Sequence, residues 1–325
     1  MMEYIYPFIF EPIIKKKLWG GKNLNKILNK PRMSDNDGES WELSCVPDNV
    51  SVLRNGPLAG KTLTELIEQF RGNLVGKAVY EEHGTTFPLL IKFIDAQQDL
   101  SIQVHPNDEL AKYRHNCLGK TEMWYVIDAE PDANIIVGFS ESLNVIQFLD
   151  IVKNNRLMSV LNKERVKPHD VFFIPAGRVH TIGKGLIIAE IQQTSDVTYR
   201  IHDFDRVDTK GNKRDLHNDL AIKAIDFTMP DSYKTIYDCS TSEQVIGTSN
   251  YFITKRRIVN KSTTLNFNHS SCTVLICVEG SLEVSYFDEL PTISKGDTVL
   301  VPSCIEELIL KPQSNAILLE IKIPG

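Results

Sequence analysis

One pattern of short strands and turns occurs twice in this chain of 325 residues. In each copy an apolar strand is followed by a turn, an aspartate, a second apolar strand that ends in proline and a small residue, and a returning strand. The first copy comprises residues 123–129, 166–176 and 186–191, and the second comprises residues 274–280, 293–303 and 316–321. Such returning strands are typical of antiparallel barrels. The repeat predicts a mainly β protein with two barrels of one design, and the simpler alternative is a β-sandwich with one barrel.

The region of the first copy carries four side chains of the kinds that bind divalent metals. Strand residues i and i+2 point to the same face, so Gln103 and His105 should enter one cavity. Glu122 and His180 lie in apolar runs bounded by turn residues, which predicts further barrel strands. Two imidazoles, a carboxylate and an amide oxygen suit Zn²⁺ with one position left open, and Fe²⁺, Mn²⁺ or Co²⁺ fit the same set. A bound metal would also remove the cost of burying an unpaired carboxylate.

Several segments around these ligands resemble one enzyme family. The segments are residues 100–108, 119–124, 175–180 and 190–200, together with 18–21 and 38–42 near the start. They are similar to the zinc-dependent mannose-6-phosphate isomerases of the cupin superfamily, and the last two are typical of the short bacterial form. The resemblance implies two cupin-type (jelly-roll) β-barrels with a small helical insertion, and a Zn²⁺ cofactor.

The repeat and the resemblance together predict two domains. Residues 1–235 are expected to form a metal-binding cupin domain with helical segments at about 62–80 and 140–162. Thr62, followed three residues later by a glutamate, predicts a capping box at the start of the first segment. Residues 236–325 are expected to form a degenerate cupin domain without metal ligands.

The second copy of the repeat lacks the metal ligands. It places Cys272 where the first copy has Glu122, and Glu307 where the first copy has His180. A thiol and a carboxylate without the accompanying histidine pair do not make the same site. We therefore expect one Zn²⁺ per chain, in the N-terminal barrel.

The resemblance also implies a reaction and assigns residues to it. The reaction is an aldose–ketose isomerisation that interconverts mannose 6-phosphate and fructose 6-phosphate through a cis-enediol, with the metal as electrophile. Matching positions imply catalytic roles for Arg200, Lys120 and Glu190. They imply contacts to the substrate for Ser101 and Arg206. The proton-transfer group stays open between Glu190, Lys120 and a metal-bound water.

Alternative interpretations stay open at this level. A non-catalytic sugar-binding cupin would keep the fold but would not need Lys120, Glu190 and Arg200 together. An Fe-dependent cupin dioxygenase would need open positions for O₂ and a mostly apolar pocket, which the amide ligand and nearby cations do not favour. Arg200 has the alternative role of a surface ion pair with a nearby aspartate. Longer relatives place a histidine before the lysine that matches Lys120, whereas this chain has Gly119.

Composition limits the partners that we expect. With 42% hydrophobic and 24% charged residues the chain is of ordinary globular composition, and its net charge of −6 argues against nucleic acid as a partner. A sugar phosphate must then be captured by a local group of cations. The six cysteines include no CxxC pair and predict reduced thiols. No apolar run is long enough to span a membrane, and the start does not resemble a signal peptide. We expect a cytoplasmic monomer or homodimer.

Overall fold

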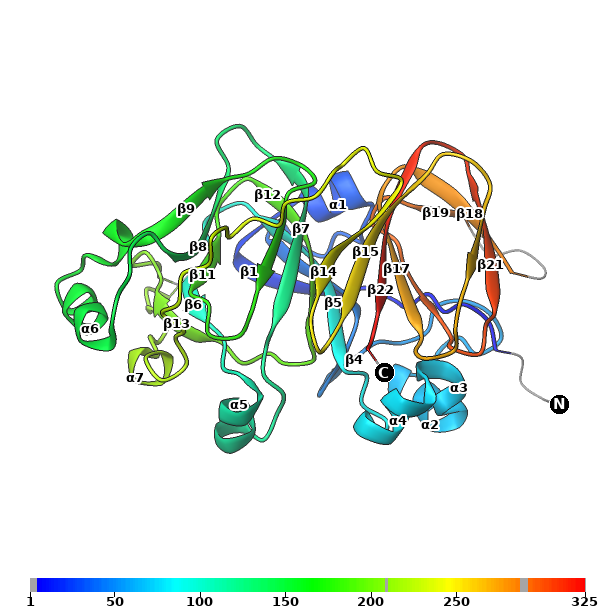
Figure 1. Cartoon of the computed structure of the whole chain (residues 1–325), viewed down its shortest axis with the longest axis horizontal. Coiled ribbons are helices and arrows are strands. Elements are labelled where there is room, and N and C mark those ends of the chain that lie inside the picture. The colour runs from blue at the N-terminus through cyan, green and yellow to red at the C-terminus, as the bar shows by residue number, and fades with distance from the viewer. Residues whose placement is uncertain (1–4, 208–209, 287–291, 325) are drawn as a thin grey trace.

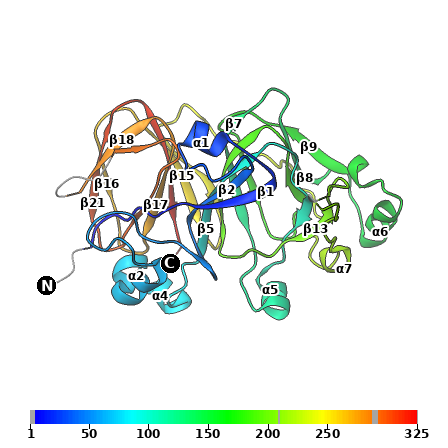
Figure 2. The same cartoon turned by 180° about the vertical axis from the view of Figure 1, so that it is seen from behind.

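Two pairs of antiparallel β-sheets lie side by side and make up most of the protein (Figure 1). The computed structural model describes residues 5–207, 210–286 and 292–324. The first pair contains the green strands at the left of Figure 1, and the second contains the orange and red strands at the right. The view from behind shows the same division, with helices α2 and α4 below the second pair (Figure 2). The predicted mainly β fold with two cupin-like barrels is confirmed.

The first sheet pair contains all the strands that carry the predicted ligands. Its six-stranded sheet has the order β1 (Ile13–Gly21), β2 (Asp37–Leu43), β5 (Leu89–Ala96), β12 (Leu186–Gln193), β7 (Glu122–Ala129) and β10 (Val171–Ile174). Its five-stranded sheet has the order β13 (Tyr199–His202), β6 (Ile102–Val104), β11 (His180–Ile182), β8 (Asn134–Phe139) and β9 (Leu161–Arg165). Several neighbouring strands, such as β5 and β12, are distant in sequence, so the barrel brings residues from distant segments together.

The second sheet pair repeats this design at smaller size. One sheet has the order β14 (Glu243–Thr248), β15 (Ile253–Val259), β22 (Ala316–Lys322), β17 (Thr273–Glu279) and β20 (Thr298–Val301). The other has the order β16 (Thr263–Asn266), β21 (Glu307–Pro312), β18 (Ser281–Ser285) and β19 (Thr292–Ser294). A separate small hairpin pairs β3 (Cys45–Val46) with β4 (Asn49–Val50).

The strand register corrects one predicted correspondence between the two barrels. In the first copy of the repeat, Glu122 pairs with Ile174, the residue before the proline that ends the apolar strand. In the second copy, Thr273 pairs with Val301, the residue before the corresponding proline. Thr273, and not Cys272, therefore stands at the position of Glu122. The correction matters because a shift of one residue turns a strand side chain to the opposite face of the sheet. Glu307 begins β21 as His180 begins β11, but Glu307 is exposed.

Helices are short and lie outside the sheets. They are α1 (Asn23–Leu28), α2 (Leu63–Phe70), α3 (Gly72–Val75), α4 (Lys77–His83), α5 (Asp108–His115), α6 (Val145–Lys153), α7 (Asn218–Ala221) and the 3₁₀ turn η1 (Leu157–Ser159). The predicted capping box of Thr62 and Glu65 is present. The helical segment expected over 140–162 is shorter, because Asn155 adopts a left-handed φ of 54° and the chain then pairs with β8 as a strand.

Three central strands of the six-stranded sheet are buried on both faces. Residues of β5, β7 and β12 contribute alternately to the core inside the first barrel and to a second cluster that also contains residues of the second sheet pair, such as Phe252 and Ile276. The two sheet pairs therefore share a hydrophobic core, and the domain boundary between residues 235 and 236 stays a prediction. Among the helices of the described residues, none has the length and apolar character needed to span a membrane.

Candidate metal centre and active site

Three neighbouring strands of the five-stranded sheet bring His180, Gln103 and Arg200 side by side. His180 of β11 pairs directly with Gln103 of β6, and Gln103 pairs directly with Arg200 of β13. Directly paired strand residues point to the same face of a sheet. His105 follows Gln103 by two residues and so turns the same way. The sheet thus assembles, from three segments, the residues that the strand spacing and the family motif identify.

The six-stranded sheet presents a second polar row from the opposite wall of the barrel. Glu190 of β12 pairs with Lys92 of β5 on one side and with Trp124 of β7 on the other. Glu122 lies two residues before Trp124 and shares its inward face. Lys92, Glu122 and Glu190 are all buried in strands whose residues are mostly apolar. A buried charge is costly unless it is paired, and here opposite charges lie together.

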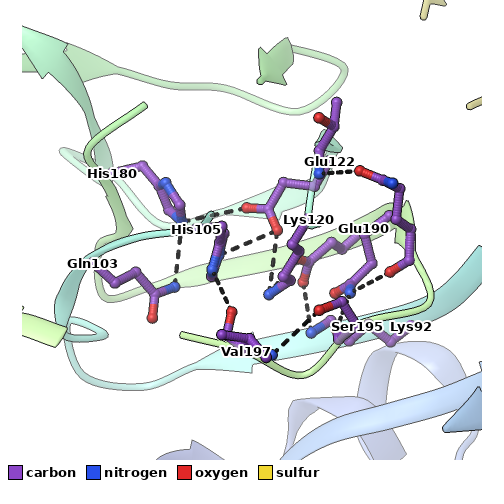
Figure 3. A network of polar contacts seen from close by, with 12 residues as sticks. Lys92, Gln103, His105, Lys120, Glu122, His180, Glu190, Ser195 and Val197 are labelled. Atoms are coloured by element: carbon purple, nitrogen blue, oxygen red, sulfur yellow. Dashed lines mark hydrogen bonds and ion pairs between the residues drawn. The ribbon is translucent and has the colours of Figure 1, made fainter. Parts of the chain in front are cut away.

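Among the described residues, His105, Glu122 and His180 form the one group of three or more His, Cys, Asp or Glu side chains that could hold a metal ion. Their ligand atoms all lie within 4.8 Å of one another. His180 Nε2 lies 3.4 Å from Glu122 Oε1, and His105 Nε2 lies 3.6 Å from Glu122 Oε2 (Figure 3). The Gln103 amide nitrogen lies 3.4 Å from His180 Nε2, and the amide turned over would present its oxygen there. Imidazole, carboxylate and amide donors therefore converge on one point.

Unpartnered buried atoms at this point support a bound cation. Within the described residues, His105 Nε2 and both carboxylate oxygens of Glu122 are buried without a hydrogen-bond partner. Leaving such atoms unpaired costs about 1–3 kcal/mol each. A divalent metal with nitrogen and oxygen ligands would satisfy all of them at once. The residues present therefore fit a metal site.

The histidines are held in the tautomer and charge state that metal binding requires. His105 Nδ1 donates to the Val197 carbonyl over 2.9 Å, and His180 Nδ1 donates to the Arg178 carbonyl over 2.8 Å, which leaves each Nε2 lone pair free. Burial lowers the pKa of His180 to about 4 and the pKa of His105 well below its usual range, so both rings are neutral. Burial and the Glu190 charge raise the pKa of Glu122, and a bound cation would oppose this because it favours the carboxylate.

Two lysines hold Glu190 beside the metal ligands. Lys92 Nζ lies 3.1 Å from Glu190 Oε2, and Lys120 Nζ lies 3.9 Å from Glu190 Oε1 and 3.4 Å from Glu122 Oε2 (Figure 3). Burial alone would raise the pKa of Glu190, but the two ammonium groups lower it to about 2. Burial alone would lower the pKa of Lys92, but Glu190 and Glu39 raise it above its ordinary value. The group therefore carries fixed opposite charges.

A cavity of about 300 Å³ opens over this group. Of the predicted catalytic and substrate-contacting residues, it is lined by Arg200, Lys120, Glu190 and Ser101, and Gln103 lines it as well. The metal-type residues His105, Glu122 and His180 lie fully buried beneath it. Sequence reasoning missed five further charged lining residues, which are Lys17, Glu39, Lys92, Asp196 and Arg214. For Lys92 the signal was present, because a charge inside an apolar strand requires a buried partner.

Arg206 lies away from the cavity lining, and Arg214 takes a place in it. Arg206 donates to the carboxylate of Asp203 over 2.6 Å and to the carbonyl of Asp99. Arg214 Nε donates to the other oxygen of Asp203 over 2.7 Å. Asp203 thus accepts hydrogen bonds from both guanidinium groups, and of the two arginines only Arg214 lines the cavity. Among the ion pairs of the described residues, Arg200 forms none with a neighbouring aspartate, and its Nε is buried without a partner.

The fold and the site define a class, which is a cupin protein of two barrels whose first barrel encloses a metal-type ligand set and a charged cavity. Residues 8–140 match the family model described as phosphomannose isomerase type I, catalytic domain. That match ends before His180, Glu190 and Arg200, so longer comparisons are needed for the rest of the site.

Full-length comparisons agree. Mannose-6-phosphate isomerase ManA of Bacillus subtilis (strain 168) is 34% identical over 315 residues, covering 96% of this chain and 98% of the relative. The mannose-6-phosphate isomerase of Streptococcus mutans serotype c is 34% identical over 305 residues, covering 92% and 93%. The crystal structure of the Bacillus subtilis mannose 6-phosphate isomerase has a TM-score of 0.87 at 31% identity, covering 97% of this chain and 99% of that one. The chain belongs to the type I phosphomannose isomerase family, in its short bacterial form.

Proposed function

We propose that the protein interconverts mannose 6-phosphate and fructose 6-phosphate through a cis-enediol. The observation that carries the proposal is the position of Lys120, whose Nζ lies 3.4 Å from Glu122 and 3.9 Å from Glu190 in a cavity that Arg200 also lines. A proton carrier, an electrophile and a fixed cation are what an aldose–ketose isomerisation needs in one place. Members of the family with this chemistry cover nearly the whole chain.

We infer that Gln103, His105, Glu122 and His180 hold one divalent cation, and we propose Zn²⁺. Neutral imidazole and carboxylate ligands with a fourth protein donor suit this ion. When bound, it would polarise the sugar oxygens at C1 and C2 and so favour removal of the C2 proton. The finding for this chain is the buried His105, Glu122 and His180 group, and the identity of the ion belongs to the proposal.

Lys120 and Glu190 are the groups that we propose move the proton between C1 and C2. Both line the cavity, and Lys120 Nζ lies 3.4 Å from Glu122 Oε2. Lys92 holds Glu190 Oε2, which leaves Oε1 on the side of Lys120. A short relay between Oε1 and Lys120 Nζ lets one proton leave the sugar carbon and return to its neighbour without reaching water.

Arg200 and Arg214 supply the positive charge that an anionic substrate requires. Arg200 lies beside the ligand Gln103, so its guanidinium is placed to meet charge that develops on the enediol oxygens. Arg214 lines the cavity, and Ser101 adds a buried hydroxyl to the same wall. We propose that Arg214 and Ser101, in place of Arg206, contact the phosphate.

The alternative functions fit the cavity less well. An Fe-dependent dioxygenase favours an apolar pocket, whereas this cavity is lined by lysines, arginines and carboxylates. A non-catalytic sugar-binding cupin has no need for a lysine and a glutamate buried against the ligands.

We also propose that the protein is located in the cytoplasm, because all six cysteines are free, as in a reducing environment. Monomer or homodimer stays a prediction.

The test compares turnover of mannose 6-phosphate and of free mannose by the wild type, Arg214→Ala and Arg206→Ala. Both arginines pair with Asp203, but only Arg214 lines the cavity, so Arg206→Ala is the matched control. We expect Arg214→Ala to raise KM for the phosphorylated sugar by about 10-fold or more, as for loss of a charged hydrogen bond. KM for free mannose should change little. A wild type that does not form fructose 6-phosphate would contradict the proposed function.

A further inference from the structure

We propose that Tyr251, which belongs to the second sheet pair, is a positioning residue for Lys120 of the first. The proposal rests on the proposed isomerase function, because it assigns the route by which Lys120 is held for proton transfer. Tyr251 lies in the turn between β14 and β15, and its hydroxyl donates to Asp108 Oδ2. Asp108 in turn forms hydrogen bonds that fix the backbone on both sides of Lys120.

The turn that carries Tyr251 is itself fixed. The Ser249 hydroxyl accepts the backbone N–H of Tyr251 over 3.1 Å and that of Phe252 over 3.0 Å, and Ser249 N donates to the Phe252 carbonyl over 3.0 Å. Phe252 is fully buried in the core shared by the two sheet pairs. The phenol therefore projects from a rigid support. Burial and the adjacent carboxylate raise the pKa of Tyr251 to about 12, so the hydroxyl keeps its proton and remains a donor.

Asp108 connects this phenol to two groups beside the active site. Its Oδ1 accepts the backbone N–H of Gly119 over 2.8 Å and the side-chain amide of Gln193 over 2.8 Å. Gln193 is buried, and its Oε1 accepts the backbone N–H of Thr121 over 2.9 Å. The carboxylate thus holds the residues on both sides of Lys120, one directly and one through Gln193.

Every backbone N–H from Gly119 to Thr121 has a defined acceptor in this arrangement. Lys120 N donates to the Pro106 carbonyl over 3.1 Å, and its two neighbours depend on the Asp108–Gln193 pair. Residues 119–121 belong to no helix or strand, because α5 ends at His115 and β7 begins at Glu122. The Lys120 ammonium therefore owes its place between Glu122 and Glu190 to these hydrogen bonds.

Close backbone contacts make this linkage stiff. A Cβ added at Gly119 would lie 2.6 Å from the backbone of Asp108, so the segment is pressed against the start of α5. A side chain at position 119 would therefore require the backbone to shift. A Cβ added at Gly247 of β14 would lie 2.4 Å from the sulfur of Met123 on β7, next to Glu122. Residues of the second sheet pair thus support the proposed catalytic lysine of the first.

The experiment measures kcat and KM for mannose 6-phosphate with Tyr251→Phe, which removes only the phenolic oxygen. We expect kcat to fall on the order of 10-fold, less than the roughly 10²-fold that a 1 Å misplacement can cost, with KM nearly unchanged. Tyr237→Phe is the matched control, because that hydroxyl donates to the His169 carbonyl, away from the Lys120 segment. Tyr237→Phe should show wild-type kinetics. Metal content and thermal midpoint should be unchanged in both variants.

A double variant decides whether Tyr251 acts through Lys120. In the Lys120→Ala background, Tyr251→Phe should have no further effect, because the group that it positions is gone. Wild-type kinetics for Tyr251→Phe, or the same fold-loss in both backgrounds, would overturn the proposal. So would an activity loss that follows loss of metal or of the folded state. A wild type that lacks isomerase activity would instead contradict the proposed function, so the two failures are distinguishable.

Discussion

At the scale of single residues, the site is marked by polar atoms that the protein leaves without partners. His105 Nε2, both Glu122 oxygens and Arg200 Nε are buried without a hydrogen-bond partner within the described residues. Each costs stability in the absence of a ligand. The Nδ1 atoms of both histidines, by contrast, each donate to a backbone carbonyl. The atoms of His105 and Glu122 therefore support the proposed cation site, and Arg200 Nε supports the proposed contact with the substrate.

Arg200→Lys tests whether the guanidinium acts on the reacting sugar. The substitution keeps the charge but loses the planar fork that can hold an oxyanion through two N–H groups. We expect kcat/KM to fall on the order of 10²-fold, as for loss of one preorganised donor. Thermal midpoint and metal content should change little, because Arg200 makes only one side-chain hydrogen bond among the described residues, to the Asp215 carbonyl. Wild-type kinetics, or inactivity caused by unfolding, would remove this role from Arg200.

At the scale of elements, strands position the buried Glu122 and Glu190, while the irregular segment after β13 positions the cavity-lining Arg214. The central strands are buried on both faces, so Lys92, Glu122 and Glu190 have little freedom to move. Arg214, by contrast, lies in irregular chain and depends on one buried carboxylate, that of Asp203. The stability of this segment should therefore depend on the charge of Asp203.

Asp203→Asn should destabilise the protein at neutral pH but not in acid. Burial would raise the pKa of Asp203, but hydrogen bonds from Arg214 and Arg206 lower it below its ordinary value. A lowered folded-state pKa gives stability that is complete above the unfolded pKa of about 4 and is lost as pH falls through the folded value. We expect the variant to lose about 1–3 kcal/mol in urea unfolding at pH 7, and to approach the wild type as pH falls through the lowered folded-state pKa of Asp203.

Asp205→Asn provides the control for that measurement. Asp205 pairs with Lys213 at the surface, so its substitution should leave the unfolding free energy nearly unchanged at both pH values. An equal deficit for Asp203→Asn at neutral and acidic pH would mean that its effect comes from packing and not from charge.

At the scale of the whole molecule, the sequence predicted the parts of the site that follow strand periodicity. Gln103 and His105 at i and i+2, and the repeat with a proline after each apolar strand, led to the two barrels and to the ligand set that the structure brings together. The repeat was less reliable for register, since Thr273 and not Cys272 matches Glu122. A one-residue shift leaves the apolar pattern of a doubly buried strand almost unchanged.

Other parts of the site follow from tertiary contacts that no local pattern encodes. Arg214 reaches the cavity from irregular chain, and Arg206, which the family motif favoured, turns to Asp203 and Asp99 instead. Tyr251 reaches Asp108 from the other sheet pair, across 143 residues of sequence. Such contacts depend on how the two barrels pack, which propensity and periodicity do not determine.

The most direct test of the account is metal content measured together with isomerase rate, before and after chelation, for the wild type, His180→Ala and Glu307→Ala. The account predicts about one tightly bound divalent ion per wild-type chain, loss of fructose 6-phosphate formation on its removal, and recovery on adding it back. Glu307→Ala should behave as wild type because Glu307 is exposed and outside the described metal-type group. His180→Ala should lose both metal and activity. Full isomerase rate in a metal-free wild type, or in His180→Ala, would contradict the account.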